Sequence, residues 1–329
     1  MIEPRAQRAV APTDSPPLSP PSGAPRRGFA PHDPFIVFAY ATLGREVETL
    51  LGVRPEPERT PTPDEVHQLR VAARRLRVAL RLFRRMLPSR DVERFRADLR
   101  WFASSLGDAR DLDVYAKSFK AYRLTLPPEQ QSELSGYELY LRRERADARQ
   151  RATVSFANPR TTALFDDITR FMAAGPSTGA LRRWRSLTVR DGVRTSVRQS
   201  AARVRRLGSR VNSRSRPTEF HELRIKAKRL RYELEFFAEA YPALKLPAKT
   251  CKALQELLGA HQDAYTATAR LRRYANLLKK QDSPASALPT ALAQLRRSQF
   301  QIARGVRRSF AEQWPDFVAL INEVRHAVA

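Results

Sequence analysis

One segment of the chain occurs twice, and this repetition restricts the possible folds more than any other feature. Residues 62–83 read TPDEVHQLRVAARRLRVALRLF and residues 216–237 read RPTEFHELRIKAKRLRYELEFF, with eleven of the 22 aligned positions identical. A second, shorter similarity follows at nearly the same offset, between residues 105–111 and residues 257–263. Two similarities in the same order predict a duplicated unit of about 150 residues.

Both copies of the segment have the periodicity of an amphipathic helix. In the first copy Thr62, Pro63 and Glu65 form the start signal of a helix, a capping box with proline inside it. Apolar residues then recur at helical spacing and form one stripe in each copy: Leu69, Ala73, Leu76, Leu80 and Phe83, and Leu223, Ala227, Leu230, Leu234 and Phe237. Each stripe is expected to face the core.

The rest of the chain favours helices as well. Helical stretches separated by prolines extend to the C-terminus, no strand pattern is evident, and only 12 glycines are available for hairpins. We therefore predict an all-α fold of two four-helix-type bundles related by a pseudo-twofold axis. The repeats should cover about 33–175 and 180–329, with Asp33 capping the first helix. Residues 1–32 are rich in proline and are predicted to form a disordered tail.

The repeated helix carries a second, cationic face beside its apolar stripe. At 100° per residue, five side chains of the first copy fall within an arc of about 80° and span about 21 Å of helix. They are His67, Arg70, Arg74, Arg77 and Arg81, and the second copy repeats the arc with His221, Arg224, Lys228 and Arg231. We call each of these rows a ladder. Glu235 occupies the position of Arg81 in the second ladder.

Such a ladder destabilises an isolated helix, because like charges three and four residues apart repel. A bound chain of anions would offset the repulsion, and the planar fork of arginine can hold phosphate oxygens bidentately. The whole chain has 60 Lys and Arg against 34 Asp and Glu, a net charge of +26. This balance favours a polyanionic partner. A solvated charged face is the simpler explanation for one such helix, but the recurrence of the ladder argues against it.

The two histidines at the start of the ladders are interpreted as hydrogen-bond donors to phosphate. A local hydrogen bond at the helix start is the alternative for His67 and His221. Metal binding needs several convergent ligands, and five histidines and one cysteine without tight spacing do not supply them. No metal, cofactor or catalytic residue is therefore predicted.

The shorter similarity is predicted to be mainly structural. Gly107 and Gly259 suit the C-terminus of a helix, and Asp111 and Asp263 suit the cap of the next one. Whether Arg110 or His261 contributes to an anion site stays open. The same is true of two other basic helix faces: Arg142, Arg145 and Arg149, and Arg190, Arg194, Arg198 and Arg205.

Two other classes of function compete with the binding of a polyanion chain. A nucleic-acid-binding protein could act through backbone charge alone, although the aromatic residues of the repeated helix, Phe83 and Phe237, fall on the core stripe rather than among the cations. A hydrolase is disfavoured because no carboxylate cluster, Ser-His-Asp set or phosphate loop is present. A single cysteine and the absence of a long apolar run favour a cytoplasmic location.

The paired His-x-x-Arg-x-x-x-(Arg/Lys)-Arg-x-Arg helices, each followed by Leu-Gly, resemble the CHAD family, the conserved histidine α-helical domain. The resemblance covers about 33–329 and implies two four-helix bundles around a basic central channel. It also implies binding of inorganic polyphosphate without chemistry, which suggests association with polyphosphate granules. By matching position the implied ligands are those of the two ladders, with Arg81 added by geometry. The Glu-x-Glu-x-Lys signature of the CYTH triphosphatase-like domain that some members carry is missing, so no enzyme is expected.

Overall fold

The computed structural model describes residues 28–54, 59–280 and 289–327, and side chains as far as Val324. Within these ranges the chain is helical without a β-strand, and the predicted all-α class is confirmed. The helices are α1 (Phe35–Gly52), α2 (Pro63–Leu82), α3 (Ser89–Ser105), α4 (Gly107–Arg123), α5 (Pro128–Glu133), α6 (Ser135–Phe156), α7 (Pro159–Ala174), α8 (Thr178–Trp184), α9 (Val189–Gly208), α10 (Pro217–Phe237), the 3-10 turn η1 (Pro242–Leu244), α11 (Lys245–Lys280) and α12 (Thr290–Ala327).

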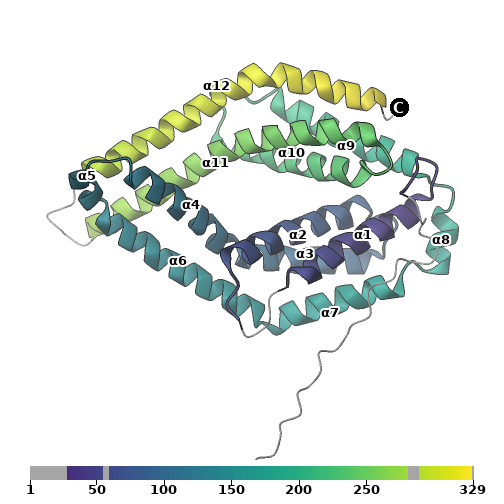
Figure 1. Cartoon of the computed structure of the whole chain (residues 1–329). Coiled ribbons are helices and arrows are strands. Elements are labelled where there is room, and N and C mark those ends of the chain that lie inside the picture. Colours follow the sequence, from purple (N-terminus) through teal and green to yellow (C-terminus); the bar gives the residue numbers. More distant parts are fainter. Residues whose placement is uncertain (1–27, 55–58, 281–288, 328–329) are drawn as a thin grey trace, which may run out of the picture.

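The helices form two rings of four with matching order (Figure 1). In the first ring α1 packs on α2, α2 on α3, α3 on α7 and α7 on α1. In the second ring α9 packs on α10, α10 on α11, α11 on α12 and α12 on α9. The repeated helix is thus α2 in one ring and α10 in the other, and these two helices also contact each other. This is the arrangement that a duplication predicts, while the duplication itself and its boundaries stay a prediction.

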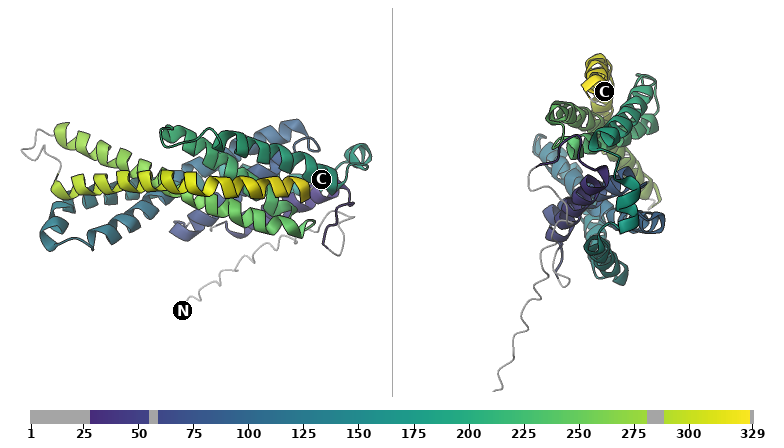
Figure 2. Two further views of the ribbon diagram at one scale, coloured as in Figure 1. Left: turned by 90° about the horizontal axis from the view of Figure 1, so that it is seen from above. Right: turned by 90° about the vertical axis from the view of Figure 1, so that its right-hand side faces the viewer.

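The two halves differ in how their long helices continue. In the second half α11 and α12 run uninterrupted for 36 and 38 residues. In the first half the corresponding path is broken at Leu106 between α3 and α4, and again between α6 and α7. The molecule is elongated (Figure 2), with α4, α5 and α6 forming one end of it, where α5 packs against α12.

The core stripes of the repeated helices are buried as predicted. Every stripe residue of α2 and α10 is at most 3% exposed. At the junction of the two halves the equivalent rings of Phe83 and Phe237 both lie against Phe38 of α1, with centroids 6.1 and 5.5 Å away. Aromatic contacts of this kind add to the area that the side chains bury. The packing therefore holds α2 and α10 at a defined crossing, with their cationic faces turned away from the core.

The predicted capping is confirmed at α2 and wrong at α1. Thr62 and Glu65 form the predicted capping box. At α1 the N-cap position belongs to Pro34, and the carboxylate of Asp33 instead accepts from the backbone N–H of Ala30 at 2.7 Å. Phe29 is 7% exposed and packs on Phe38. The prediction that residues up to 32 form a tail is thus wrong for 28–32, while residues 1–27 lie outside the described part.

The shorter similarity does not cap helices as predicted. Gly107 begins α4 directly after Leu106, which keeps a right-handed helical conformation, so α3 has no glycine C-cap. Gly259 lies inside α11, and Asp111 and Asp263 are both interior to their helices. Glycine at position 259 would permit the helix to end there. Packing of α11 on α10 and α12 along its length keeps the helix continuous. Pro315, one of the prolines expected to separate helical stretches, lies inside α12.

Candidate anion-binding pocket

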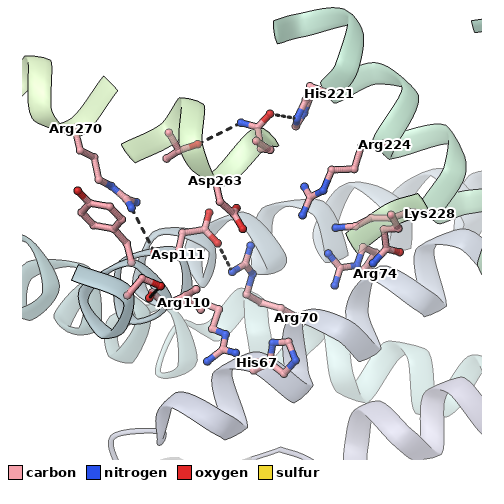
Figure 3. A pocket seen from close by; sticks show the side chains of 16 residues that line it. His67, Arg70, Arg74, Arg110, Asp111, His221, Arg224, Lys228, Asp263 and Arg270 are labelled. Carbon is pink, nitrogen blue, oxygen red and sulfur yellow. Dashed lines mark hydrogen bonds and ion pairs between the residues drawn. The ribbon is translucent and has the colours of Figure 1, made fainter. Parts of the chain in front are cut away.

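The two ladders converge on one cavity between the halves of the molecule. The cavity has a volume of about 540 Å³ and is lined from α2, α4, α10 and α11. Six of the nine predicted ligands lie on its wall: His67, Arg70, Arg74, His221, Arg224 and Lys228. Figure 3 shows them projecting from α2 and α10 toward the same space. Residues about 150 positions apart in the sequence are thus brought together in one cavity.

The cavity wall carries more positive than negative charge. Its cations are Arg70, Arg74, Arg110, Arg224, Lys228 and Arg270, and its carboxylates are Asp111 and Asp263. Six positive and two negative side chains leave a net charge of +4 with the histidines neutral. Arg110, left open by the sequence, lines the cavity, and Arg270 of α11 was not foreseen. Arg270 lies outside both repeated motifs, and no signal in the sequence marked it.

Of the six cavity cations, Arg70 alone forms an ion pair within the described residues. The Nε atom of Arg224 is buried and makes no hydrogen bond there. Lys228 makes neither a hydrogen bond nor an ion pair with any described residue, whereas Arg74 donates through Nε to the hydroxyl of Tyr232 at 3.2 Å. Burial, and then the charges of Arg74 and Arg224, lower the pKa of Lys228 from 10.5 to about 7. The empty cavity therefore holds positive charges that repel one another and are poorly solvated.

The two histidines are held differently. His221 Nδ1 lies 2.9 Å from Gln262 Oε1. An amide oxygen only accepts, so Nδ1 carries the proton and Nε2 is free to donate only when the ring is charged. His67 has no hydrogen-bond partner among the described side chains, and its pKa is lowered by burial and by the nearby Arg110 and Arg74. A phosphate near the ring of His67 would favour its charged, donating form.

The two carboxylates of the cavity neutralise part of its charge unequally. Asp111 Oδ1 accepts from Arg70 Nη1 at 2.9 Å, and its side chain is 57% exposed. Asp263, at the matching position of the other half, makes no hydrogen bond or ion pair within the described part of the chain. Burial raises the pKa of Asp263, and the charge of Arg224 partly opposes this effect. Arg70 is therefore paired in the empty cavity, while Arg224 is not.

Three predicted ligands lie outside the cavity. Arg231 is 13% exposed, pairs with Glu235 at 3.2 Å and stacks over the ring of Tyr232. Arg77 and Arg81 follow Arg74 on the next two turns of α2, beyond the cavity wall. The ladders were predicted from each helix by itself. The sequence therefore did not indicate how far along α2 and α10 the shared cavity extends.

Other repeated residues hold the structure together instead. Arg75, identical in both copies, pairs with the buried Glu46 of α1 at 2.8 Å and with Glu235 of α10. Its counterpart Arg229 pairs with Glu233, which is fully buried. His261, which aligns with Ala109, is 2% exposed and stacks on Phe220 with centroids 4.4 Å apart. This histidine belongs to the core of the second half.

The other basic faces singled out in the sequence also lie away from the cavity. Arg145 and Arg149 share the carboxylate of Asp113, and Arg142 pairs with Glu138. On α9, Arg205 bonds to the side chain of Asn322. In the described ranges, no three His, Cys, Asp or Glu side chains gather as a metal site would require. Nor does any helix there combine the length and apolarity of a membrane span.

Comparison with known proteins identifies the family of the chain. The model of the CHAD domain matches residues 41–272, which is more than half of the sequence. The chain belongs to the CHAD domain family. Polyphosphate binding is the known property of this family, and the CHAD domain is a binding domain rather than a catalytic one.

Solved structures share the fold at low sequence identity. The CHAD domain from the plant Ricinus communis is 23% identical, with a TM-score of 0.52 over 93% of this chain and 96% of that one. PptA from Streptomyces chartreusis is 18% identical, with a TM-score of 0.65 over 84% of this chain and 98% of that one. Uncharacterized proteins from two strains of Mycobacterium tuberculosis are 25% identical over 73% of this chain. The chain covers 45% of the length of these curated relatives.

Proposed function

We propose that this CHAD domain binds inorganic polyphosphate in the cavity between its two halves and does no chemistry on it. The observation that carries the proposal is the convergence of two ladders on one cavity, five of whose six cations form no ion pair within the described residues. Arg70, Arg74, Arg224 and Lys228 would hold successive phosphates of one chain, with His67 and His221 donating hydrogen bonds. Arg110 and Arg270 add charge from α4 and α11.

A bound phosphate chain would supply the negative charges that the cavity cations lack. An unpaired charge in a partly buried site is costly, and a phosphate oxygen supplies the missing partner. Arginine can contact two oxygens of one phosphate at once, so neighbouring arginines of a ladder can each hold one unit of the chain. A flexible chain with one charge per unit matches such a row. A single phosphate would satisfy only part of it.

Nucleic acid is the weaker candidate for this cavity. A double helix is a stiff rod and cannot enter a cavity of about 540 Å³. A single strand would need aromatic faces on which its bases stack. The aromatic ring on the wall, Tyr115, is covered by the guanidinium of Arg270, and its hydroxyl contacts Tyr137 at 2.9 Å. Binding of nucleic acid through backbone charge would therefore take place on the outer surface, with low selectivity.

The proposed setting is the cytoplasm, where the domain would associate with polyphosphate granules. Binding without catalysis is proposed because the cavity wall offers no activated nucleophile. His221 is bonded to Gln262 rather than to a hydroxyl, and that amide in turn donates to Thr266. General-base catalysis needs a base that is hydrogen-bonded to the group whose proton it removes. Among the described residues, neither histidine of the wall is bonded to a hydroxyl.

The test is a titration with polyphosphate and with duplex DNA over a range of salt concentrations. We expect polyphosphate to remain bound at about 0.3 M salt, where binding of DNA through backbone contacts has collapsed. DNA binding as tight as polyphosphate binding at that salt concentration would refute the proposal.

A matched pair of variants links binding to the cavity. The first removes two cavity charges, Arg224→Gln with Lys228→Gln. The control removes two exposed charges at α8, Arg182→Gln with Arg185→Gln. Loss of charge-assisted hydrogen bonds should weaken polyphosphate binding at least about a hundredfold in the first variant. The control should change it little, and equal effects in both would remove the cavity from the mechanism.

A further inference from the structure

Beyond the cavity, α2 leads into a second group of arginines, which includes the two residues of its ladder that do not line the cavity. Arg77 lies within electrostatic range of Arg96 and Arg100 on α3. Arg81 lies within range of Arg96, and of Arg203 and Arg229 from the other half. We call this set the Arg81 cluster: Arg77, Arg81, Arg96, Arg100, Arg203 and Arg229. Three helices besides α2 contribute to it, so it is a tertiary feature.

The cluster contains too few carboxylates to neutralise it. Arg96 pairs with Glu93 and Arg229 with Glu233. The other four arginines make no ion pair or hydrogen bond with any residue in the described part of the chain, and the Nε atom of Arg77 is buried without a partner. Burial and the neighbouring arginines lower the pKa of Arg77 and of Arg81. A ligand or solvent anions must balance the remaining charge.

The second half shows what the same positions look like when they are neutralised. The position of Arg81 is occupied there by Glu235, which pairs with Arg75 and Arg231. In the aligned repeats the counterpart of the Arg75–Glu235 pair is Arg229 with Arg81, two like charges within electrostatic range of each other. The ladder of α10 therefore ends in ion pairs, and the ladder of α2 ends in unpaired arginines. An anionic chain that leaves the cavity meets attraction along α2 and a carboxylate along α10.

We propose that the Arg81 cluster is a second phosphate-binding segment, which continues the cavity along α2 and gives the bound chain one direction of exit. The proposal rests on the proposed function of the cavity and specifies its ligand as a chain longer than the cavity. From His67 to Arg81 the row spans about 21 Å. Arg203 also lines an open hollow of about 610 Å³ on α9, together with Arg205 and Arg206. Arg203 therefore belongs both to the Arg81 cluster and to this basic hollow on α9.

The experiment compares a short and a long ligand, tripolyphosphate and a chain of several tens of phosphates. The variant is Arg81→Glu with Arg100→Gln. Glu at position 81 reproduces the arrangement of Glu235 and can pair with Arg229, so the fold should tolerate it. The control, Arg182→Glu with Arg185→Gln, makes the same change of charge at α8, away from both sites. Circular dichroism and thermal unfolding establish that both variants fold.

Long-chain affinity should fall about tenfold or more in the cluster variant relative to the control. Affinity for tripolyphosphate, which the cavity alone can hold, should stay within about twofold of the control. An unchanged long-chain affinity, or an equal loss for both ligands, would overturn the proposal. The two proposals can fail separately. Either of these outcomes refutes the cluster proposal alone if wild type binds the long chain and the cavity variant Arg224→Gln with Lys228→Gln does not. Failure of wild type to bind either ligand refutes both.

A second measurement covers the case in which Arg81→Glu disturbs the fold. The milder variant Arg81→Gln is compared with Arg182→Gln by the salt dependence of long-chain binding. Removal of one phosphate-binding side chain reduces the slope of log K against log salt by about 0.7 for a flexible single strand. A reduced slope in Arg81→Gln alone supports direct binding of phosphate by Arg81, and equal slopes in the two variants refute it.

Discussion

Polyphosphate binding should depend steeply on pH because of one side chain, Lys228. In the empty cavity its pKa falls from 10.5 to about 7, through burial and then the charges of Arg74, Arg224 and Arg231. A bound chain of phosphates replaces this repulsion by attraction and returns the pKa toward its ordinary value. Since the pKa is lower in the free protein, binding takes up a proton above pH 7. Affinity is therefore highest below pH 7 and falls as pH rises from there.

The size of the effect follows from the two pKa values. If the pKa of Lys228 returns to 10.5 in the complex, linkage gives a fall in affinity of about fiftyfold between pH 7 and pH 9. Fluorescence anisotropy of a labelled chain at constant ionic strength measures this fall directly. Titration of the chain's own end groups is common to all protein variants and cancels in their ratio.

The decisive variant is Lys228→Arg. Arg74 occupies the equivalent position of the first copy, so the site accommodates arginine, and a guanidinium stays charged throughout this range. The profile of Lys228→Arg should be nearly flat from pH 7 to pH 9. The control His67→Gln removes a group whose pKa is lowered below 6.5 in the free protein, so it should keep the fall in affinity that Lys228 causes between pH 7 and pH 9. A slope in Lys228→Arg as steep as in wild type would refute the assignment to Lys228.

Three further changes test the roles assigned to buried charge. Lys228→Met should raise the stability of the empty protein by about 1–4 kcal/mol near neutral pH, because a well-packed apolar group replaces a poorly solvated charge, and should weaken polyphosphate binding; a lower melting temperature would contradict this. Arg75→Ala should lower the free energy of unfolding by about 3–5 kcal/mol in urea titrations, since Glu46 is left buried and unpaired. A loss below about 1 kcal/mol would show that the ion pairs of Arg75 contribute little to the stability of the fold. Asp111→Asn should strengthen polyphosphate binding in calorimetry by releasing Arg70, and weaker binding would mean that Asp111 positions Arg70 for the ligand.

The features that depend on one helix at a time were predictable from the sequence. Spacing of apolar residues in residues 62–83 and 216–237 indicated which faces of α2 and α10 are buried, and all the stripe residues are. The all-α class followed from the same periodicity, since a pattern of 3.6 residues cannot be satisfied by a strand. The ladders were visible for the same reason. Where a helix continues or breaks was less predictable, as Gly259 and Pro315 show, because packing along the length of a helix outweighs a local preference.

What only the tertiary structure decided is which elements face each ladder. The sequence placed Arg74, Arg77 and Arg81 in one row, but the crossing of α2 and α10 puts Arg74 in the shared cavity and the other two beside α3 and α9. It also turns Arg231 toward Glu235 and brings Arg270 to the cavity wall from a helix without a motif. Charge on a helix face depends on residues a few positions apart, whereas its partners come from residues about 150 positions away. The sequence therefore determined that the chain presents two cationic rows, and the fold determined how each row ends.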